Sequence, residues 1–328
     1  SETGVKYSLT SNQMTTSEIN NNLIEFRDTK RILRFENLPT KPTLSILRGF
    51  SAPVKINTEQ TEEELERLLL HDDDPFNRWQ AAQDLALRAI FGRIKSIKDK
   101  TSPQKAEKLS NAFHTLITQG LSDPAFISLT LALPSELDLA REMEKEVDPE
   151  VIHIARCSLK EEVSLPLIGE MEELYNQLED PRPYQSDAAS AGRRALRATL
   201  LDLIAAGNKD KGEALAEKQF VRANNMTERL SALSTLAVIG RPSREKALAN
   251  FYEQFSNDHL VIDKWFALQA MIPEPTTIQR VIKLMQHADF SMKNPNRLRS
   301  LIGTFTKDRK STRLNSSHIP LSRMPSSA

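Results

Sequence analysis

The sequence has little cysteine and little glycine, and these shortages exclude several kinds of protein. Cys157 is the single cysteine among 328 residues, so the chain cannot form an internal disulfide framework, and a reducing compartment is favoured. The ten glycines include no Gly-rich loop of the kind that binds phosphate groups. No apolar run approaches the roughly 20 residues that a membrane-spanning helix needs. We therefore expect no membrane partner.

The sequence also has no excess of charge of either sign. Its 44 lysines and arginines balance its 44 aspartates and glutamates. A protein that binds nucleic acid through phosphate contacts needs basic residues in clustered excess. We therefore expect no nucleic-acid partner. The length of 328 residues permits about two domains.

The first 54 residues favour β-structure. Val5, Tyr7 and Leu9 alternate with polar residues, as a half-buried strand requires. Apolar runs follow at residues 32–35 and 44–47, and nearby prolines confine them to short or edge strands. Because so few strands cannot bury both faces of a sheet, we interpret this segment as the end of a larger β-sandwich.

From Thr58 onward the apolar residues follow a helical period. Thr61 and Glu64 have the spacing of a capping box, in which each side chain accepts a hydrogen bond from the backbone N–H of the other residue. Asp74 precedes Pro75, which places a carboxylate at the N-cap and a proline at the first helical position. Similar helix starts are predicted at Asp123-Pro124, Asp148-Pro149, Ser135 with Asp138, and Ser243 after Pro242.

The succession of helices predicts a helical domain over residues 55–307. Ten or more helices follow one another with short turns and without strand patterns. Such a run is typical of antiparallel helix pairs that stack into an α-solenoid of the ARM/HEAT-like kind. No fixed-period repeat is present, which argues against tetratricopeptide and ankyrin arrays. Pro-Arg-Pro at 181–183 predicts a break between two sub-bundles. We class the protein as mainly α, with a short β-sandwich remnant before the solenoid.

Two small groups of residues could bind metal ions but have simpler interpretations. His153 and Cys157 lie four residues apart in a predicted helix, so they could be two metal ligands or a thiol beside a base. We favour a core thiol and a partly buried histidine, because no further ligands are nearby in the sequence. His-Asp-Asp-Asp at 71–74 could bind a hard cation, but a solvated loop that ends in an N-cap explains it better.

Five segments of the sequence match the pattern of one protein family. They are Phe-Glu-Asn-Leu-Pro at 35–39, Arg-Gly-Phe-Ser-Ala-Pro-Val at 48–54, Asn-Asn-Met-Thr at 224–227, Ile-Asp-Lys-Trp-Phe at 262–266 and Asn-Pro-Asn-Arg-Leu-Arg-Ser-Leu-Ile-Gly at 294–303. They closely resemble the bacterial aminopeptidase N family of zinc metallopeptidases. The resemblance runs with few gaps from about Leu33 to Lys307, and such a long similarity is more specific than a short motif.

The resemblance implies both a fold and a function. In the family, an Ig-like β-sandwich domain precedes the helical solenoid, in agreement with the order of patterns described above. The parent enzyme removes N-terminal amino acids from peptides with a zinc-bound water that a glutamate activates. This chain would be its C-terminal part, which caps the catalytic chamber and restricts access. Its partners would be the upstream catalytic domain and short peptides, in the bacterial cytoplasm.

The catalytic zinc motif of that family does not occur in the sequence. A His-Glu-x-x-His motif places two imidazoles on one face of a helix, with the glutamate beside them as general base. None of the six histidines has another histidine four residues further on. We therefore expect no catalytic residues, no metal site and no peptidase activity in this chain alone, with zinc bound by the upstream part of the parent enzyme.

One segment has a predicted role in binding a ligand. Arg297 and Arg299 follow Asn296 at the start of a predicted helix, where the helix dipole disfavours cations. An acidic partner or an anionic ligand should therefore offset their charge. The resemblance implies that this segment faces an internal cavity, where the C-terminal carboxylate of a peptide could pair with a guanidinium. The alternative is a structural ion pair, which we favour for Arg297 and weigh equally for Arg299.

Two further interpretations each have an alternative. Residues 308–328 resemble the translation of a sequencing adapter, so we interpret them as an artefactual tail; the alternative is a natural disordered tail rich in serine. For the function, the alternative to the peptidase is a free-standing α-solenoid that binds a protein partner in its groove. The motifs at 35–54 argue against a free solenoid, because it would not need part of a β-sandwich.

Overall fold

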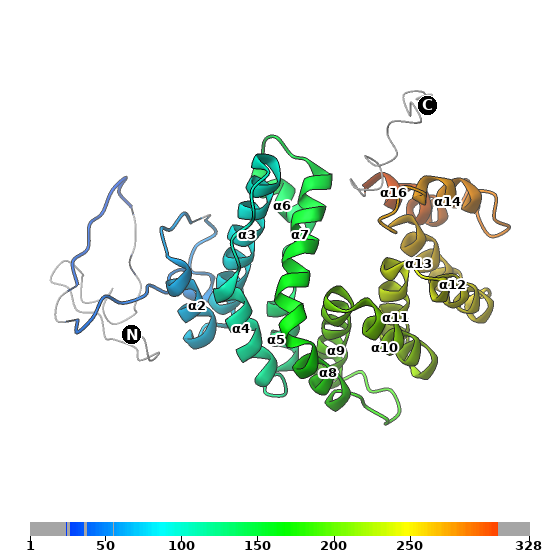
Figure 1. Cartoon of the computed structure of the whole chain (residues 1–328), viewed down its shortest axis with the longest axis horizontal. Coiled ribbons are helices and arrows are strands. Elements are labelled where there is room, and N and C mark those ends of the chain that lie inside the picture. Colours follow the sequence, from blue (N-terminus) through cyan, green and yellow to red (C-terminus); the bar gives the residue numbers. More distant parts are fainter. Residues whose placement is uncertain (1–23, 25–26, 36–37, 55, 308–328) are drawn as a thin grey trace. The chain divides into compact units, whose positions relative to one another are not determined.

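The computed structural model describes residues 24, 27–35, 38–54 and 56–307 (Figure 1). The regular structure among these residues is helical, which confirms the expectation of a mainly helical protein. The chain divides into two compact units. The first ends at Asp84 and the second begins at Leu85, so the division falls within helix α3.

Short turns connect most of the helices, as the sequence predicted. The elements are η1 (Arg48–Phe50), α2 (Glu62–His71), α3 (Pro75–Asp99), α4 (Glu107–Thr118), α5 (Pro124–Leu131), α6 (Glu136–Met143), α7 (Pro149–Ser164), η2 (Leu165–Leu167), α8 (Ile168–Gln177), α9 (Ala188–Gly207), α10 (Lys209–Arg222), α11 (Met226–Ile239), α12 (Pro242–Phe255), α13 (His259–Ala270), α14 (Thr277–Leu284), α15 (Pro295–Leu298), η3 (Arg299–Gly303) and α16 (Thr304–Lys307).

The first unit contains no strand among its described residues. The runs at 32–35 and 44–47 therefore do not form the predicted strands, and the regular element that precedes α2 is the 3-10 turn η1. A strand is maintained by hydrogen bonds to a neighbouring strand, and no described residue of this unit supplies them. The remaining predicted strand, at residues 5–9, lies outside the described part of the chain.

The Arg-Gly-Phe part of the 48–54 segment docks on the acidic turn between α2 and α3. Arg48 Nη1 donates to Asp72 Oδ1 at 2.6 Å, and the backbone N–H of Gly49 donates to Asp74 Oδ2 at 3.0 Å. Gly49 has a φ of +62°, which glycine adopts at little cost. The acidic turn therefore binds Arg48 of the same unit, and Asp74 caps α3. This agrees with the interpretation of residues 71–74 as a loop that ends in an N-cap, rather than as a cation site.

The predicted helix starts are confirmed with one exception. Thr61 and Glu64 form both hydrogen bonds of the capping box. Side-chain oxygens also cap the helices that follow Asp74, Asp123, Ser135 and Asp148. The exception is Ser243, which donates its hydroxyl to Glu213 instead of capping α12. Because Pro242 takes the first helical position, the N-cap falls on Arg241, which has no side-chain cap.

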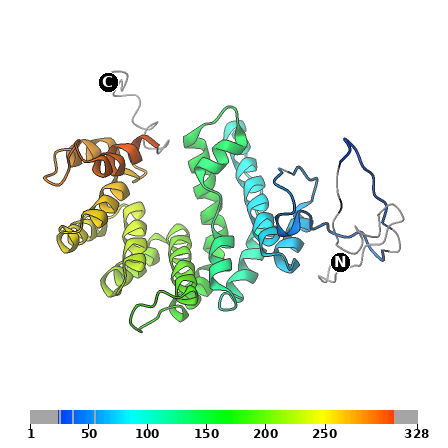
Figure 2. The ribbon, with the colours of Figure 1, turned by 180° about the vertical axis from the view of Figure 1, so that it is seen from behind.

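In the second unit, successive helices pack against one another, as the ARM-type prediction requires. Helix α9 contacts α5, α7, α8, α10 and α11, and the contacts then continue from α11 through α12 and α13 to α14 (Figures 1 and 2). The close approach of α9 and α10 depends on Gly212, where an added Cβ would lie 2.4 Å from Ala205 Cα. The predicted break at 181–183 is the loop between α8 and α9, but these helices pack together and do not belong to separate bundles.

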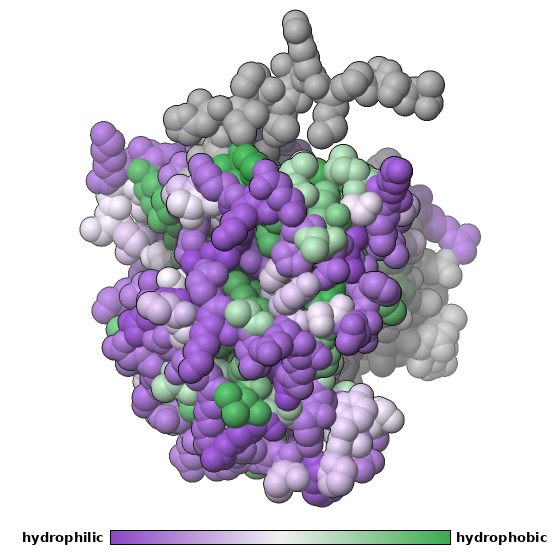
Figure 3. Space-filling view, turned by 90° about the vertical axis from the view of Figure 1, so that its right-hand side faces the viewer, coloured by the Kyte–Doolittle hydropathy of each residue, from purple (hydrophilic) through white to green (hydrophobic). Residues whose placement is uncertain are grey.

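The surface on the side of α12 to α14 is mainly hydrophilic. Hydrophobic side chains form small, separate groups there (Figure 3), as is normal for protein surfaces. Among the residues that the structure describes, no helix combines the length and the apolar character needed to cross a membrane.

Candidate functional site

The predicted ligand-binding segment consists of three short consecutive turns at the end of the described chain. α15 is followed by η3, which is a turn of π-helix, and then by α16. Asn294 Oδ1 accepts hydrogen bonds from the backbone N–H groups of Asn296 at 3.0 Å and Arg297 at 3.3 Å. Together with Pro295 at the first helical position, this cap fixes the start of the segment.

Arg297 is buried, with 3% of its surface exposed. Its Nη1 donates to Asp263 Oδ1 at 2.6 Å and to the backbone oxygen of His259 at 3.2 Å. Its Nε donates to the backbone oxygen of Asp289 at 2.9 Å, and its guanidinium lies 5.3 Å from the centre of the Phe266 ring. The structural ion pair is therefore present. The alternative expectation, that Arg297 lines a cavity, is not met, because its charge is offset inside the protein.

This ion pair joins two of the segments that define the family resemblance. Asp263 belongs to 262–266 on α13, and Arg297 belongs to 294–303. In the same helix, Trp265 donates its indole N–H to a backbone oxygen of α12 at 2.9 Å. Two segments that are about thirty residues apart in the sequence therefore pack against each other.

Asn296 and Arg299 are exposed, in contrast to Arg297. Two residues along a helix correspond to a rotation of about 200°, so Arg299 lies on the other side of the segment from Arg297. Among the residues that the structure describes, the guanidinium of Arg299 has no ion-pair partner. Of the three predicted residues, Asn296 and Arg299 are therefore available to a ligand.

A supporting cluster behind the segment was not identified from the sequence. Tyr252 donates its hydroxyl to Asp289 Oδ2 at 2.5 Å, and this hydrogen bond raises the pKa of Tyr252. The ring of His287 lies 4.9 Å from that of Tyr252 and 5.4 Å from that of Trp265. Because the backbone of Asp289 also accepts from Arg297, the cluster holds the loop before α15 against α13. These residues come from separate elements, so no local pattern pointed to them.

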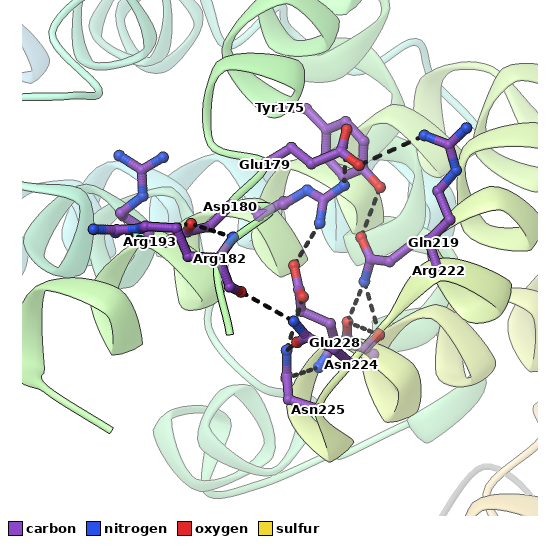
Figure 4. A network of polar contacts seen from close by, with 12 residues as sticks. Tyr175, Glu179, Asp180, Arg182, Arg193, Gln219, Arg222, Asn224, Asn225 and Glu228 are labelled. Atoms are coloured by element: carbon purple, nitrogen blue, oxygen red, sulfur yellow. Dashed lines mark hydrogen bonds and ion pairs between the residues drawn. The ribbon is translucent and has the colours of Figure 1, made fainter. Parts of the chain in front are cut away.

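A second network surrounds the Asn-Asn-Met-Thr segment at 224–227 (Figure 4). Asn225 caps α11 by accepting a hydrogen bond from the backbone N–H of Glu228 at 3.0 Å. Asn224 Nδ2 donates to the backbone oxygen of Arg182 at 3.1 Å and so fastens the loop between α8 and α9. Asn225 therefore stabilises the start of α11, and Asn224 stabilises the loop between α8 and α9.

Arg197 connects this network to the interior of the second unit. Only 6% of its surface is exposed. It forms an ion pair with Glu228, and its guanidinium lies 4.5 Å from the centre of the Tyr175 ring. Tyr175 donates its hydroxyl to Gln219 Oε1 at 2.6 Å, and burial raises the pKa of Tyr175 to about 12. Apart from the Asn-Asn segment, sequence reasoning did not identify this network.

Cys157 is exposed, so the expectation of a core thiol is wrong. Its Sγ lies 3.7 Å from both ring nitrogens of half-buried His153, whose Nδ1 lies 2.9 Å from Glu136 Oε1. Partial burial raises the pKa of Cys157, but the hydrogen bond and charge of His153, with Arg156 and Lys160, bring it below the ordinary value. Within the described ranges, no three His, Cys, Asp or Glu side chains are grouped so that they could hold a metal ion.

Two family models match the chain. Residues 62–312 match the family described as "Domain of unknown function (DUF3458_C) ARM repeats", and residues 4–59 match the family described as "Domain of unknown function (DUF3458) Ig-like fold". The first match includes all helices from α2 to α16. The helical part is therefore an ARM-repeat domain, and a small region of Ig-like family precedes it.

Known proteins support the same assignment. Aminopeptidase N of Caulobacter vibrioides is 38% identical over 287 residues, which are 85% of this chain and 33% of that protein. Aminopeptidase N of Escherichia coli is 32% identical over 285 residues, 87% of this chain and 32% of that protein. The crystal structure of Legionella pneumophila aminopeptidase A in complex with aspartic acid matches with a TM-score of 0.73 and 28% identity, over 83% of this chain and 32% of that one. The chain thus spans about a third of the length of these relatives, and it belongs to the bacterial aminopeptidase N family.

Proposed function

We propose that this chain is the C-terminal part of a zinc-dependent aminopeptidase that removes N-terminal amino acids from peptides. In this proposal the ARM-repeat domain closes the catalytic chamber and restricts access to it. The observation that carries the proposal is the 38% identity to aminopeptidase N over 287 residues, which are 85% of this chain. The zinc and the general base would be supplied by the part of the enzyme that this chain does not cover. We place the enzyme in the bacterial cytoplasm, with which the use of a single cysteine is compatible.

A direct test compares the chain alone with the chain joined to the sequence encoded upstream of it. Zinc content and hydrolysis of an alanyl anilide are measured for both proteins. We expect stoichiometric zinc and turnover only when the upstream part is present, and a His-Glu-x-x-His motif within that part. Zinc-dependent turnover by the chain alone would overturn the proposal.

Within this proposal, Asn296 and Arg299 hold the distal end of a short peptide. Arg299 is exposed on a segment that the buried Arg297–Asp263 pair holds in place. A guanidinium can form two parallel hydrogen bonds with a carboxylate, so the C-terminal carboxylate of the peptide is the group that Arg299 would recognise. Asn296 would add an amide that can donate to the same carboxylate.

The role of Arg299 is tested in the complete enzyme with two substrates. Arg299→Ala should raise KM for tri- and tetrapeptides by roughly 10- to 100-fold, because a hydrogen bond to a charged group is worth about 1.5–3 kcal/mol. An alanyl anilide lacks the carboxylate and should be little affected. Lys293→Ala is the matched control, since it removes a neighbouring exposed cation. Equal effects of Arg299→Ala on both substrates would remove this residue from the proposal.

A second candidate function is a free-standing solenoid scaffold that binds a protein partner. The ARM-repeat architecture favours it, because such repeats often present extended binding surfaces. The match of residues 4–59 to an Ig-like family opposes it, because a solenoid scaffold has no need of that region. An upstream reading frame without any zinc-binding motif would decide for the scaffold.

A further inference from the structure

A small polar cavity lies beside the Asn-Asn-Met-Thr segment, apart from the segment with Asn296 and Arg299. Its volume is about 110 Å³. A water molecule occupies about 30 Å³ in the liquid, so the cavity has room for a few waters or for one small polyatomic ion. The ends of α8 and α10 and the start of α11 line it, together with buried Arg197 from α9.

Several side chains that line the cavity already use their hydrogen-bonding groups within the protein. Gln219 accepts from Tyr175 and donates to the backbone oxygen of Glu228 at 2.8 Å. Glu228 accepts from Arg197 and from Asn225, the latter at 2.9 Å. These groups therefore form a fixed wall and have little capacity left for a ligand.

A second set of side chains at the cavity has unused capacity. Glu179 Oε2 lies 3.9 Å from Arg197 Nη2, and Glu179 Oε1 lies 3.8 Å from Arg222 Nη1. Both distances exceed the 2.7–3.2 Å of an N–H···O hydrogen bond, so these contacts, one of which is the dashed line between Glu179 and Arg222 in Figure 4, are long ion pairs. Buried Arg197 Nε has no hydrogen-bond partner among the described residues. Lys218 has no ion-pair partner among them either and lies one turn before Arg222 on α10.

The balance of charge decides which kind of ligand fits. Glu228 is paired with Arg197, and Asp180 is paired with Arg182. The remaining charged groups at the cavity are the cations of Lys218 and Arg222 and the single carboxylate of Glu179. Because Arg182, which does not itself line the cavity, neutralises Asp180, they leave a net charge of +1. Guanidinium groups match the geometry of carboxylate and phosphate oxygens.

We propose that this cavity is a binding site for a small oxyanion, a carboxylate or a phosphate group. The ligand displaces the Glu179 side chain from between the guanidinium groups of Arg197 and Arg222. It accepts hydrogen bonds from these two arginines and from Lys218. Glu179 is one-third exposed, so its side chain can move into solvent when the anion enters. The site is independent of Arg299 and of peptidase activity.

The test measures binding of inorganic phosphate and of acetate to the full chain by isothermal titration at constant ionic strength. We expect one saturable site for at least one of the two anions. Arg222→Gln should weaken binding about tenfold, because it removes a charge-assisted hydrogen bond. Glu179→Gln should tighten binding several-fold, because it removes the competing carboxylate. Arg222 and Glu179 are both partly exposed, so neither change should disturb the fold.

Lys246→Gln serves as the matched control, since it removes one exposed helical cation away from the cavity. Tighter binding of phosphate would identify a phosphate group as the ligand, and tighter binding of acetate would identify a carboxylate. Absence of saturable binding for both anions would overturn the proposal. So would an equal loss in Lys246→Gln and Arg222→Gln. Weaker anion binding after Glu179→Gln would also overturn it, because removal of a competing carboxylate cannot weaken the binding of an anion. Because the readout is binding to this chain, the outcome does not depend on the aminopeptidase proposal.

Discussion

The ion pair between Arg297 and Asp263 should be the most sensitive point of the C-terminal helices. The two side chains are 4% and 16% exposed, and their closest atoms are 2.6 Å apart. Removing one partner of a buried pair leaves an uncompensated charge and costs about 3–5 kcal/mol. In Asp263→Ala, Arg297 keeps the backbone oxygens of His259 and Asp289 as acceptors. We therefore expect a loss near the lower end, about 3 kcal/mol.

The assay is urea unfolding of the wild type, Asp263→Ala, Arg297→Met and the double variant. A loss of about 3 kcal/mol should also lower the melting temperature by roughly 6–12 °C for a domain of this size. The double variant should lose less than the sum of the two single losses, because it contains no unpaired buried charge. A coupling energy of at least about 2 kcal/mol is expected for this pair.

The control is the ion pair between Lys211 and Glu172, which has a comparable distance of 2.5 Å but side chains that are 37% and 34% exposed. Glu172→Ala should cost about 1 kcal/mol or less, because solvent screens an exposed pair. If Asp263→Ala costs no more than Glu172→Ala, then the contact with Asp263 is not a buried ion pair, and our explanation of the two joined segments fails.

Three further outcomes are expected. The alkylation rate of Cys157 by iodoacetamide should rise with pH through a midpoint below that of an unperturbed thiol, because the hydrogen bond and charge of His153 lower the pKa of Cys157. His153→Gln should move this midpoint upward. Gly212→Ala should cost about 1–3 kcal/mol in urea unfolding, because the new Cβ would meet Ala205. Gly92→Ala, at an open position inside α3, should stabilise the protein by up to about 1 kcal/mol.

The helix starts could be predicted because their determinants are local. An N-cap involves a side chain and a backbone N–H two or three residues later, and Thr61, Asp123 and Asp148 satisfy this rule with neighbours that the sequence displays. The prediction of strands at 32–35 and 44–47 was wrong, because strand formation is not decided locally. A strand depends on a partner that is distant in the sequence, and an alternating or apolar run does not show whether that partner is present.

The polar networks were beyond sequence reasoning for a similar reason. Glu179 lies in the loop after α8 and Arg222 is the last residue of α10, and they are more than forty residues apart in the sequence. Nothing in their local sequence distinguishes them from the many other charged residues on helix surfaces. The prediction that Cys157 is a core thiol was wrong for another reason. The spacing of four residues places Cys157 next to His153 on the same face of α7, but it does not show whether that face points to the core or to solvent.

The two arginines of the C-terminal segment show what the sequence did determine. At about 100° per residue, positions 297 and 299 lie on nearly opposite sides of a helix. One side of a helix that packs on a core is buried and the other is solvated, so the two cations could not have the same environment. Which one is buried depends on Asp263, which lies 34 positions away and accepts from Arg297. The burial of Arg297 therefore leaves Arg299 on the solvated side, and this is the physical reason to test Arg299, rather than its neighbour, as the residue that meets a peptide.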